Sequence, residues 1–232
     1  MKSIDAASIR ACLPWDELIE ALAVAVRRNR VSSPPRQSLA VPVPGHADAT
    51  LLMMPAWEPG SAIGVKAVTY FPSNGGTLIP TINAGYLLFD GSDGRLIAVL
   101  DGDELTTRRT AAASALASRH LSRHDSRVLL VAGTGQLAVD VAEAHASVRS
   151  FDRILIWGRR ADRAQVVVDQ LLARELPAER APTLAEAVSG ADVISCVTAA
   201  TEPFLEGDRL TPGTHVDLIG SFGPAMREAD DS

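Results

Sequence analysis

Lysine and cysteine are both scarce in this sequence. Among 232 residues there are two lysines, Lys2 and Lys66, and two cysteines, Cys12 and Cys196. The cysteines lie far apart inside otherwise apolar segments, which favours reduced, buried thiols over a disulfide scaffold. No run approaches the roughly 18 apolar residues of a membrane span, and the N-terminus lacks the basic and apolar regions of a signal peptide. These absences predict a soluble, cytoplasmic protein with no membrane partner.

Acidic residues outnumber basic ones. The sequence has 22 Lys+Arg against 28 Asp+Glu, a net charge of -6 and a pI of about 5.4. This balance argues against nucleic acid or anionic lipid as the main partner, although a local basic site can still hold a small anion. The hydrophobic content of 47% excludes a disordered chain and suffices for one or two domains with buried cores.

The first half of the chain has the pattern of a helix followed by a sheet. Apolar residues recur at helical spacing from Trp15 to Asn29, directly after Pro14. Short β-prone runs, cut by proline and glycine, then follow at 39–43, 51–54, 63–69, 85–89 and 96–100. A turn at 89–94 fits a hairpin. This region predicts a mostly antiparallel sheet.

The second half alternates strands with helices. After an alanine-rich helix at 104–121, strands are expected at 128–132, 154–157, 193–197 and 215–219, with helices at 136–148, 161–174 and 184–189. Such alternation is typical of βαβ units and a parallel sheet. We therefore expect an α/β protein with an N-terminal α+β domain at 1–122 and a Rossmann-type domain at 123–232.

A dinucleotide-binding fingerprint opens the second domain. A buried strand runs into Gly133-Thr134-Gly135-Gln136-Leu137-Ala138, the pattern Gly-x-Gly-x-x-Ala, and a helix follows. The first glycine permits the tight turn, the second lets the backbone approach a pyrophosphate, and the small alanine lets helix and strand pack closely. A plain strand-to-helix turn is the alternative. The flanking elements favour nucleotide binding.

The end of the second parallel strand bears on the choice of cofactor. A carboxylate usually stands there to hold the adenosine ribose of NAD, but this sequence reads Trp157-Gly158-Arg159-Arg160. Arginines can instead bind the extra phosphate of NADPH, although arginines on a loop are often only solvated. We expect NADPH, with NADH as the alternative.

The first domain holds candidate cations for a substrate. Lys66 lies inside an apolar run and Arg36 follows two prolines. Lysine can exchange a proton when partly desolvated, whereas arginine grips carboxylates, but a lysine at a strand end is also an ordinary feature. His120 and His124 have the spacing of two metal ligands but no evident third, so they are expected to close a helix rather than bind a metal.

Several motifs together resemble the ornithine cyclodeaminase/mu-crystallin family. They are Pro80-Thr81 with Asn83, Gly85 and Asp90, then Leu105-Thr106 with Arg109-Thr110-Ala111-Ala112, then Gly133-Thr134-Gly135, and Gly220 to Pro224 with Arg227-Glu228. The resemblance covers the chain from the first helix to its end. It implies a dimerising, substrate-binding domain, a Rossmann domain, and a small substrate beside the nicotinamide.

The resemblance also implies roles for individual residues. Arg36 is expected on the substrate carboxylate and Lys66 near the reacting nitrogen, where it is the expected catalytic residue. Thr81, Arg109, Thr198 and Ile219 are expected to contact the cofactor. The glycine motif, Gly133 to Leu137, is expected on the pyrophosphate and Arg159 and Arg160 on the extra phosphate. Phe222 stands where cyclodeaminases have an aspartate, and is expected beside the substrate.

These residues predict an NAD(P)H-dependent reductase of a small cyclic imino acid, either Δ1-pyrroline-2-carboxylate or its six-membered homologue. The partners expected are that substrate and a second copy of the chain, bound through the N-terminal domain. Ornithine cyclodeamination and non-enzymatic, NADPH-dependent ligand binding of the mu-crystallin type are the alternatives. Family members continue past the position of Ser232, so a truncated Rossmann domain is expected, and an inactive remnant is a third possibility.

Overall fold

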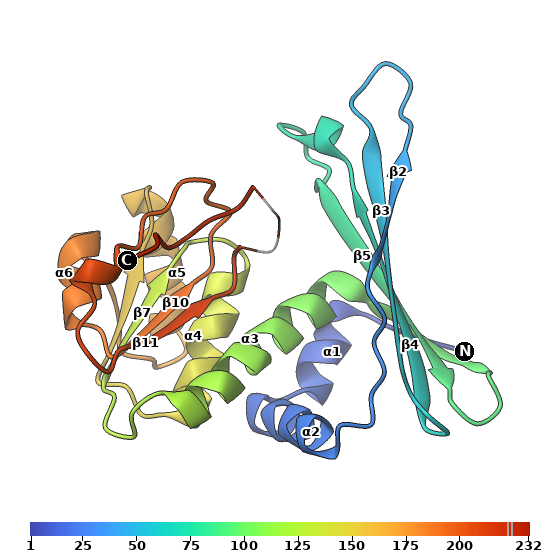
Figure 1. The fold of residues 1–232 in the computed structure, drawn as a ribbon, viewed down its shortest axis with the longest axis horizontal. Coiled ribbons are helices and arrows are strands. Elements are labelled where there is room, and N and C mark those ends of the chain that lie inside the picture. The colour runs from blue at the N-terminus through green and yellow to red at the C-terminus, as the bar shows by residue number, and fades with distance from the viewer. Residues whose placement is uncertain (222, 224) are drawn as a thin grey trace. The chain divides into compact units, whose positions relative to one another are not determined.

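The structure, a computed structural model, describes residues 1–221, 223 and 225–232 (Figure 1). Phe222 therefore lies outside the described residues. The chain forms two compact units: Met1–Pro14 with Ala23–Arg108, and Trp15–Leu22 with Arg109–Ser232. The longer segment of the second unit begins at Arg109, whereas the predicted domain boundary lies at residue 122. That boundary stays a prediction.

An antiparallel sheet dominates the first unit. Its strands are β1 (Lys2–Ile4), β2 (Gln37–Val41), β3 (Ala49–Glu58), β4 (Ala62–Tyr70), β5 (Ile82–Asp90) and β6 (Leu96–Asp101), in the order β1-β6-β5-β4-β3-β2. All neighbours pair antiparallel except β1 and β6. The predicted sheet is confirmed, and so is the turn between β5 and β6, where Gly94 has a φ of 75°.

Three helical segments accompany this sheet: α1 (Ala6–Cys12), α2 (Trp15–Arg28), which is shared with the second unit, and the 3₁₀ turn η1 (Pro72–Asn74). In α1 only Ile9 is buried, and Cys12 is exposed. The prediction that both cysteines are buried was therefore wrong for Cys12, because the last turn of α1 leaves its side chain in solvent. Cys196 is buried as predicted.

The helix α3 (Gly102–Leu121) begins against the sheet of the first unit. The Asp101 carboxylate caps it by accepting a hydrogen bond from the Glu104 N–H at 2.9 Å. A Cβ on Gly102 would lie 2.5 Å from the Ala84 carbonyl carbon, so only glycine allows this close approach of helix to strand. His120 lies in the last turn of α3, but His124 lies beyond its end. The prediction that both histidines close the helix was wrong for His124, since the helix ends three residues earlier.

The second unit contains a five-stranded parallel sheet. Its strands are β7 (Val128–Ala132), β8 (Arg153–Trp157), β9 (Ala178–Arg180), β10 (Val193–Cys196) and β11 (His215–Leu218), in the order β11-β10-β7-β8-β9. Its helices are α4 (Leu137–Val148), α5 (Ala161–Leu172) and α6 (Leu184–Gly190), with the 3₁₀ turn η2 (Gly207–Arg209). All pairings are parallel, which confirms the predicted Rossmann-type sheet.

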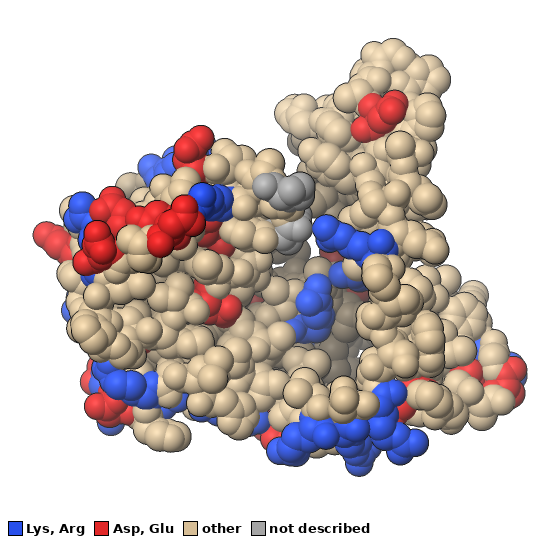
Figure 2. Space-filling view, viewed as in Figure 1, with Lys and Arg blue, Asp and Glu red and all other residues tan. Residues whose placement is uncertain are grey.

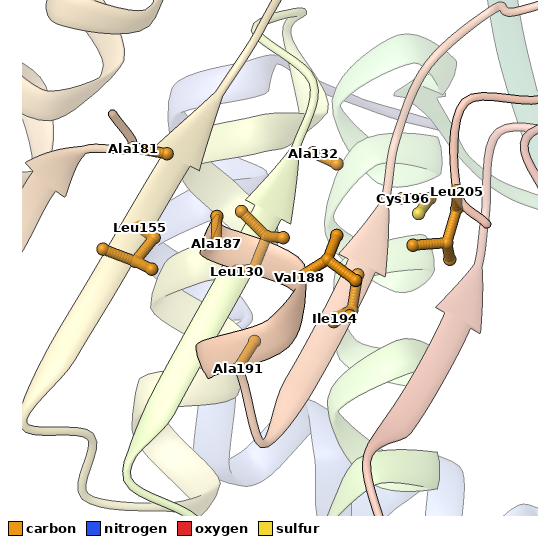
Figure 3. Close-up of a cluster of buried hydrophobic side chains, with 10 residues drawn as sticks. All are labelled: Leu130, Ala132, Leu155, Ala181, Ala187, Val188, Ala191, Ile194, Cys196 and Leu205. Atoms are coloured by element: carbon orange, nitrogen blue, oxygen red, sulfur yellow. The ribbon is translucent and has the colours of Figure 1, made fainter. Parts of the chain in front are cut away.

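A core of small and aliphatic side chains holds α6 against this sheet. Figure 3 shows α6 lying over β7 and β10, with Val188 of the helix near Leu130 and Ile194 of the strands. Leu130 and Ile194 are fully buried, and burying such a side chain contributes about 1.5–3 kcal/mol. This packing fixes the positions at which the parallel strands end. In the described part of the chain, no helix combines the length and the apolar character that crossing a membrane requires.

Candidate functional site

The turn after β7 has the geometry of the dinucleotide fingerprint. Gly133 has a φ of +143°, and its N–H donates to the Trp157 carbonyl oxygen at 2.8 Å. A Cβ at this position would lie 2.6 Å from Val197 Cγ2 and 2.7 Å from the Val197 carbonyl oxygen. Both the dihedral angle and the packing therefore require glycine.

The rest of the motif leaves the start of α4 accessible. A Cβ on Gly135 would meet no atom within 4 Å, and Gly135 and Gln136 are exposed. Ala138 is fully buried, and its N–H donates to the Gly135 carbonyl oxygen at 3.1 Å. The backbone N–H groups of a helix's first turn attract anions, and an open approach at Gly135 fits a pyrophosphate. The residues present fit the phosphates of a dinucleotide.

The turns after neighbouring strands support each other at this edge of the sheet. The side chain of Thr134, which is half-buried, lies over Gly158, where a Cβ would come within 2.5 Å of Thr134 Cγ2. The Val197 N–H donates to the Ala132 carbonyl oxygen, and the Ile219 N–H donates to the Cys196 carbonyl oxygen, both at 2.9 Å. Thus β7, β8, β10 and β11 end side by side, and the glycine motif, Thr198 and Ile219 lie at one edge.

A buried carboxylate that the sequence analysis gave no role joins two of these strand ends. Glu228 is 1% exposed. It accepts hydrogen bonds from the Thr198 N–H at 2.6 Å, the Thr198 hydroxyl at 2.7 Å and the Gly220 N–H at 2.9 Å. Its position in the Arg227-Glu228 motif was the available signal, but its distant partners could not be read from the sequence.

The two arginines after β8 differ in their contacts. Both are exposed. The Arg160 guanidinium donates to the Asp162 carboxylate at 2.7 Å, and this hydrogen bond raises the pKa of Arg160 and lowers that of Asp162. The ring of Trp157, the last residue of β8, stacks on the ring of Phe204, with 5.4 Å between ring centroids. Because Arg160 already pairs with Asp162, we expect Arg159 to be the more available of the two for a phosphate.

A second polar network lies within this unit. The Ser114 hydroxyl of α3 donates to the carboxylate of Asp217 on β11 and lies 2.8 Å from His145 Nε2 on α4. His145 is fully buried, and burial, with smaller effects of His215 and Arg149, lowers its pKa to about 3. The imidazole is therefore neutral at physiological pH, and Asp217 is held within its strand.

The first unit contains the predicted substrate lysine. Lys66 on β4 pairs directly with Met54 on β3 and with Tyr86 on β5. Its ammonium nitrogen lies 3.4 Å from the Thr106 hydroxyl of α3, and the residue is half-buried. A lysine in a sheet, partly desolvated and held near a hydroxyl, fits a group that exchanges a proton.

Tyr86 shapes the surface next to this lysine. Its hydroxyl lies directly over Gly64, where a Cβ would come within 1.7 Å of it. Burial raises the pKa of Tyr86. Because residues two apart on a strand share a face, Gly64 and Lys66 lie on the same side of β4, and the Tyr86 ring lies on that side too.

The register brings Arg36 into the same row of the sheet. Gln37 pairs with Met53, and the next residue of β3, Met54, pairs with Lys66. Arg36, which precedes β2 directly and is exposed, therefore stands at the end of the row that contains Lys66. Adjacent strands are about 4.8 Å apart, and β3 lies between the backbones of Arg36 and Lys66. The distance between their strands is therefore comparable to the length of a small amino or imino acid.

Thr81 and Arg109 are two further residues that were predicted to contact the cofactor. Thr81 immediately precedes β5, and its carbonyl oxygen accepts a hydrogen bond from the Phe71 N–H at 2.8 Å. Arg109 follows Thr106 by three residues on α3, and partial desolvation lowers the pKa of its guanidinium. Their contacts with a cofactor stay predictions. In the described ranges, no group of three His, Cys, Asp or Glu side chains could hold a metal ion.

A parallel sheet with a glycine turn at its carboxyl edge, joined in one chain to an antiparallel unit with a sheet lysine, defines a two-unit nucleotide-binding protein of the Rossmann class. The chain belongs to the ornithine cyclodeaminase/mu-crystallin family, whose model matches residues 4–232. The family resemblance of the sequence is thereby confirmed.

Named relatives and a solved structure agree with this assignment. A Δ1-pyrroline-2-carboxylate reductase of Paracoccus denitrificans is 37% identical over 95% of this chain and 68% of its own length. The ketimine reductase mu-crystallin of Mus musculus is 38% identical over 82% of this chain and 60% of its own. The Δ1-pyrroline-2-carboxylate reductase of Thermococcus litoralis, solved with NADH and L-proline, superposes with a TM-score of 0.87 at 26% identity, over 99% of this chain and 72% of its own. The chain spans about two thirds of the length of the curated relatives.

Proposed function

We propose that this chain provides the substrate lysine and the dinucleotide turn of an NAD(P)H-dependent reductase that acts on a small cyclic imino acid. Relatives that carry the name Δ1-pyrroline-2-carboxylate reductase support the substrate class. The observation that carries the proposal is the register of β2, β3 and β4, which, extended by one residue before Gln37, brings Arg36 level with Met54 and Lys66. This row offers one cation for a carboxylate and one for a nitrogen.

The chemistry follows from these two side chains. Arg36 binds the substrate carboxylate, because a guanidinium pairs with a planar carboxylate through two parallel hydrogen bonds. Lys66 holds a proton at the imine nitrogen, so that the C=N carbon becomes electrophilic and the nitrogen ends as an amine. A bound NAD(P)H would supply the hydride for that carbon. The products are the cyclic amino acid, L-proline or L-pipecolate, and the oxidised coenzyme.

The second unit would hold the coenzyme. Gly133 to Leu137 would bind the pyrophosphate through the backbone and the start of α4. Thr198 and Ile219, at the ends of β10 and β11, would line the nicotinamide, and Arg109 of α3 would contact the coenzyme. A contact of Thr81 with the coenzyme is a separate prediction of the family resemblance. Arg159 would favour NADPH by binding its extra phosphate, with Arg160 in support, and NADH remains usable through the shared pyrophosphate contacts.

The decisive test is turnover. Purified protein is mixed with NADPH, or with NADH, and a panel of cyclic and acyclic imino acids, and the coenzyme absorbance is followed. Oxidation of NADPH by Δ1-pyrroline-2-carboxylate or its six-membered homologue supports the proposal. Tight coenzyme binding without turnover of any imine favours a mu-crystallin-like ligand carrier, and failure to bind coenzyme at all favours an inactive remnant.

A homodimer through the first unit is part of the proposal. Large apolar side chains of this unit are exposed, among them Leu39, Tyr70, Leu78, Ile79 and Ile82. Solvent-exposed apolar groups of this number favour contact with another protein surface. Light scattering on the purified chain tests this, and replacing Leu39 and Ile82 with serine should shift a dimer towards the monomer mass.

A further inference from the structure

Glu228 differs from the other carboxylates near the end of the chain. Figure 2 shows acidic side chains exposed over this part of the second unit, which includes Glu206, Asp208 and Asp231. Glu228 is instead buried, at 1% exposure, and both of its carboxylate oxygens accept hydrogen bonds. A buried carboxylate is costly unless its hydrogen bonds are made, so its donors define its role.

The donors come from two separate strand ends. One oxygen accepts from the N–H and the hydroxyl of Thr198, two residues after β10, and the other accepts from the N–H of Gly220, two residues after β11. A Cβ on Gly220 would lie 2.5 Å from the carboxylate and 1.9 Å from the Thr198 carbonyl oxygen. Glycine at 220 is what allows the two strand ends to meet at one side chain.

The segment that carries Glu228 is itself hydrogen-bonded to the segment that follows β10. The Glu228 carbonyl oxygen accepts from the N–H groups of Phe204 and Leu205, both at 3.0 Å, and the Arg227 N–H donates to the Ala200 carbonyl oxygen at 2.8 Å. Leu205 also forms a parallel bridge with Ala229 and is 2% exposed. These hydrogen bonds fix the backbone of Glu228. Its carboxylate in turn fixes the positions of Thr198 and Gly220.

We infer that Glu228 is a positioning residue for the nicotinamide ring. It acts by fixing the two backbone segments, 197–200 and 218–221, between which the ring would lie. The inference rests on the proposed function, which places Thr198 and Ile219 at that ring. Hydride transfer needs the reacting atoms about 3–3.5 Å apart, so a shift of about 1 Å in these segments lowers the rate far more than it lowers coenzyme affinity.

The test is Glu228→Gln, compared with Glu206→Gln as a control. The glutamine has one acceptor oxygen, so its NH₂ group must face either the Gly220 N–H or the Thr198 donors. Glu206 is an exposed carboxylate in an ion pair with Arg209, and the same substitution there leaves the strand ends untouched. Hydrogen–deuterium exchange of peptides covering 197–200 and 218–221 reports on the segments with or without turnover.

The expected result is faster exchange in those two segments alone, a kcat about 10-fold or more below that of the unmodified protein, and a larger kinetic isotope effect with NADPH deuterated at the transferred position. The Kd for NADPH should change less than threefold, because the Gly133 turn is intact. Unchanged exchange in both segments overturns the inference, as does a global rise in exchange with equal losses in coenzyme affinity and kcat. If the unmodified protein turns over no imine, the proposed function fails. The role of Glu228 is then decided by hydrogen–deuterium exchange in the two segments and by the fluorescence of bound NADPH, since neither measurement requires turnover.

Discussion

The ammonium nitrogen of Lys66 lies 3.4 Å from the hydroxyl oxygen of Thr106, so a strand of the first sheet is tied to the first turns of α3. Thr106 in turn donates its hydroxyl hydrogen to the Gly102 carbonyl oxygen at 2.6 Å. This arrangement directs the lysine side chain and restricts its rotamers. It also explains why one lysine occurs within an apolar strand.

Lys66→Ala should lower kcat for the imino acid about 100-fold or more, because positioned proton donors contribute roughly 10²–10⁴-fold to a rate. The Kd for NADPH, measured by fluorescence, should change less than twofold, since the proposed coenzyme contacts lie mainly in the second unit. Lys2→Ala, at the other lysine and on the exposed strand β1, is the matched control. Full activity in Lys66→Ala would place the chemistry elsewhere.

Arg36→Ala should raise the KM for the imino acid about 10- to 100-fold, with a smaller effect on kcat. A charge-assisted, bidentate hydrogen bond to the substrate carboxylate is lost, while the proton donor remains. Arg30→Ala is the control, because Arg30 is exposed in the same connecting segment and lies 3.8 Å from Glu58. Equal KM values for the two variants would contradict the assignment of Arg36. Steady-state kinetics with varied substrate at saturating NADPH provide the measurement.

Arg159→Gln should weaken NADPH binding about 10-fold and NADH binding less than twofold, since only NADPH has the additional phosphate. Arg160→Gln should have the smaller effect of the two, because Asp162 already pairs with that guanidinium. Titration of both coenzymes into each variant tests the order. Arg163→Gln on the exposed start of α5 is the control. Equal weakening of NADPH and NADH by Arg159→Gln would show that the arginine does not read the phosphate.

The buried imidazole of His145 should make the protein sensitive to acid. Its pKa is about 3 in the folded protein against 6.5 for an unperturbed histidine, so the unfolded chain binds a proton first as the pH falls. Stability from this group is complete above pH 6.5 and falls below it by about 1.4 kcal/mol per pH unit, until the pH reaches about 3. The positive charges of His215 and Arg149 contribute to the lowered pKa of His145. For His215 itself, the nearby Asp217 carboxylate acts in the opposite direction and raises the pKa, although burial lowers it overall.

Urea unfolding at several pH values between 4 and 7.5 measures this dependence. In His145→Gln the free energy of unfolding should fall less steeply with decreasing pH than in the unmodified protein. His46→Gln, at an exposed histidine of the first unit, should keep the original slope. An unchanged slope in His145→Gln would mean that the imidazole is protonated in the folded state.

The local signals of the sequence predicted most of this fold. Strand β7 was predicted with its observed bounds, because five apolar residues end at a glycine whose φ no other residue tolerates. The helix α1 and the three-residue strands β1 and β9 were missed. Lys2–Ile4 and Ala178–Arg180 have no apolar run, and they become strands only through pairing with β6 and β8. Tertiary pairing, not local propensity, decides such elements.

The candidate site divides in the same way. Gly133 could be predicted because the turn needs glycine locally, and Gly135 because a pyrophosphate needs an open approach to the backbone. The hydrogen bonds from Thr198 and Gly220 to Glu228 could not, since their partners are 30 and 8 residues away in the sequence. The contact of Ser114 with Asp217 joins residues separated by 103 positions. A single sequence contains no sign of which distant donor meets which acceptor.

The last prediction separates imine reduction from ornithine cyclodeamination. In the segment that follows β11 the sequence has Phe222, which the family resemblance matches to the cyclodeaminase aspartate, and a phenyl ring neither accepts a proton nor pairs with the distal ammonium of ornithine. Asp217 lies within β11 and accepts a hydrogen bond from Ser114, and Glu228 is buried and accepts hydrogen bonds from Thr198 and Gly220, so we expect neither carboxylate to take over that role. We therefore expect oxidation of NADPH by Δ1-pyrroline-2-carboxylate or its six-membered homologue, and no ammonia from L-ornithine with catalytic NAD+.

Coenzyme absorbance and an ammonia assay on one preparation measure both reactions. Steady ammonia release from ornithine would overturn the reductase proposal. Phe222→Asp is the complementary variant, in which we expect imine reduction to fall, because a carboxylate would replace the ring that the family resemblance predicts beside the substrate.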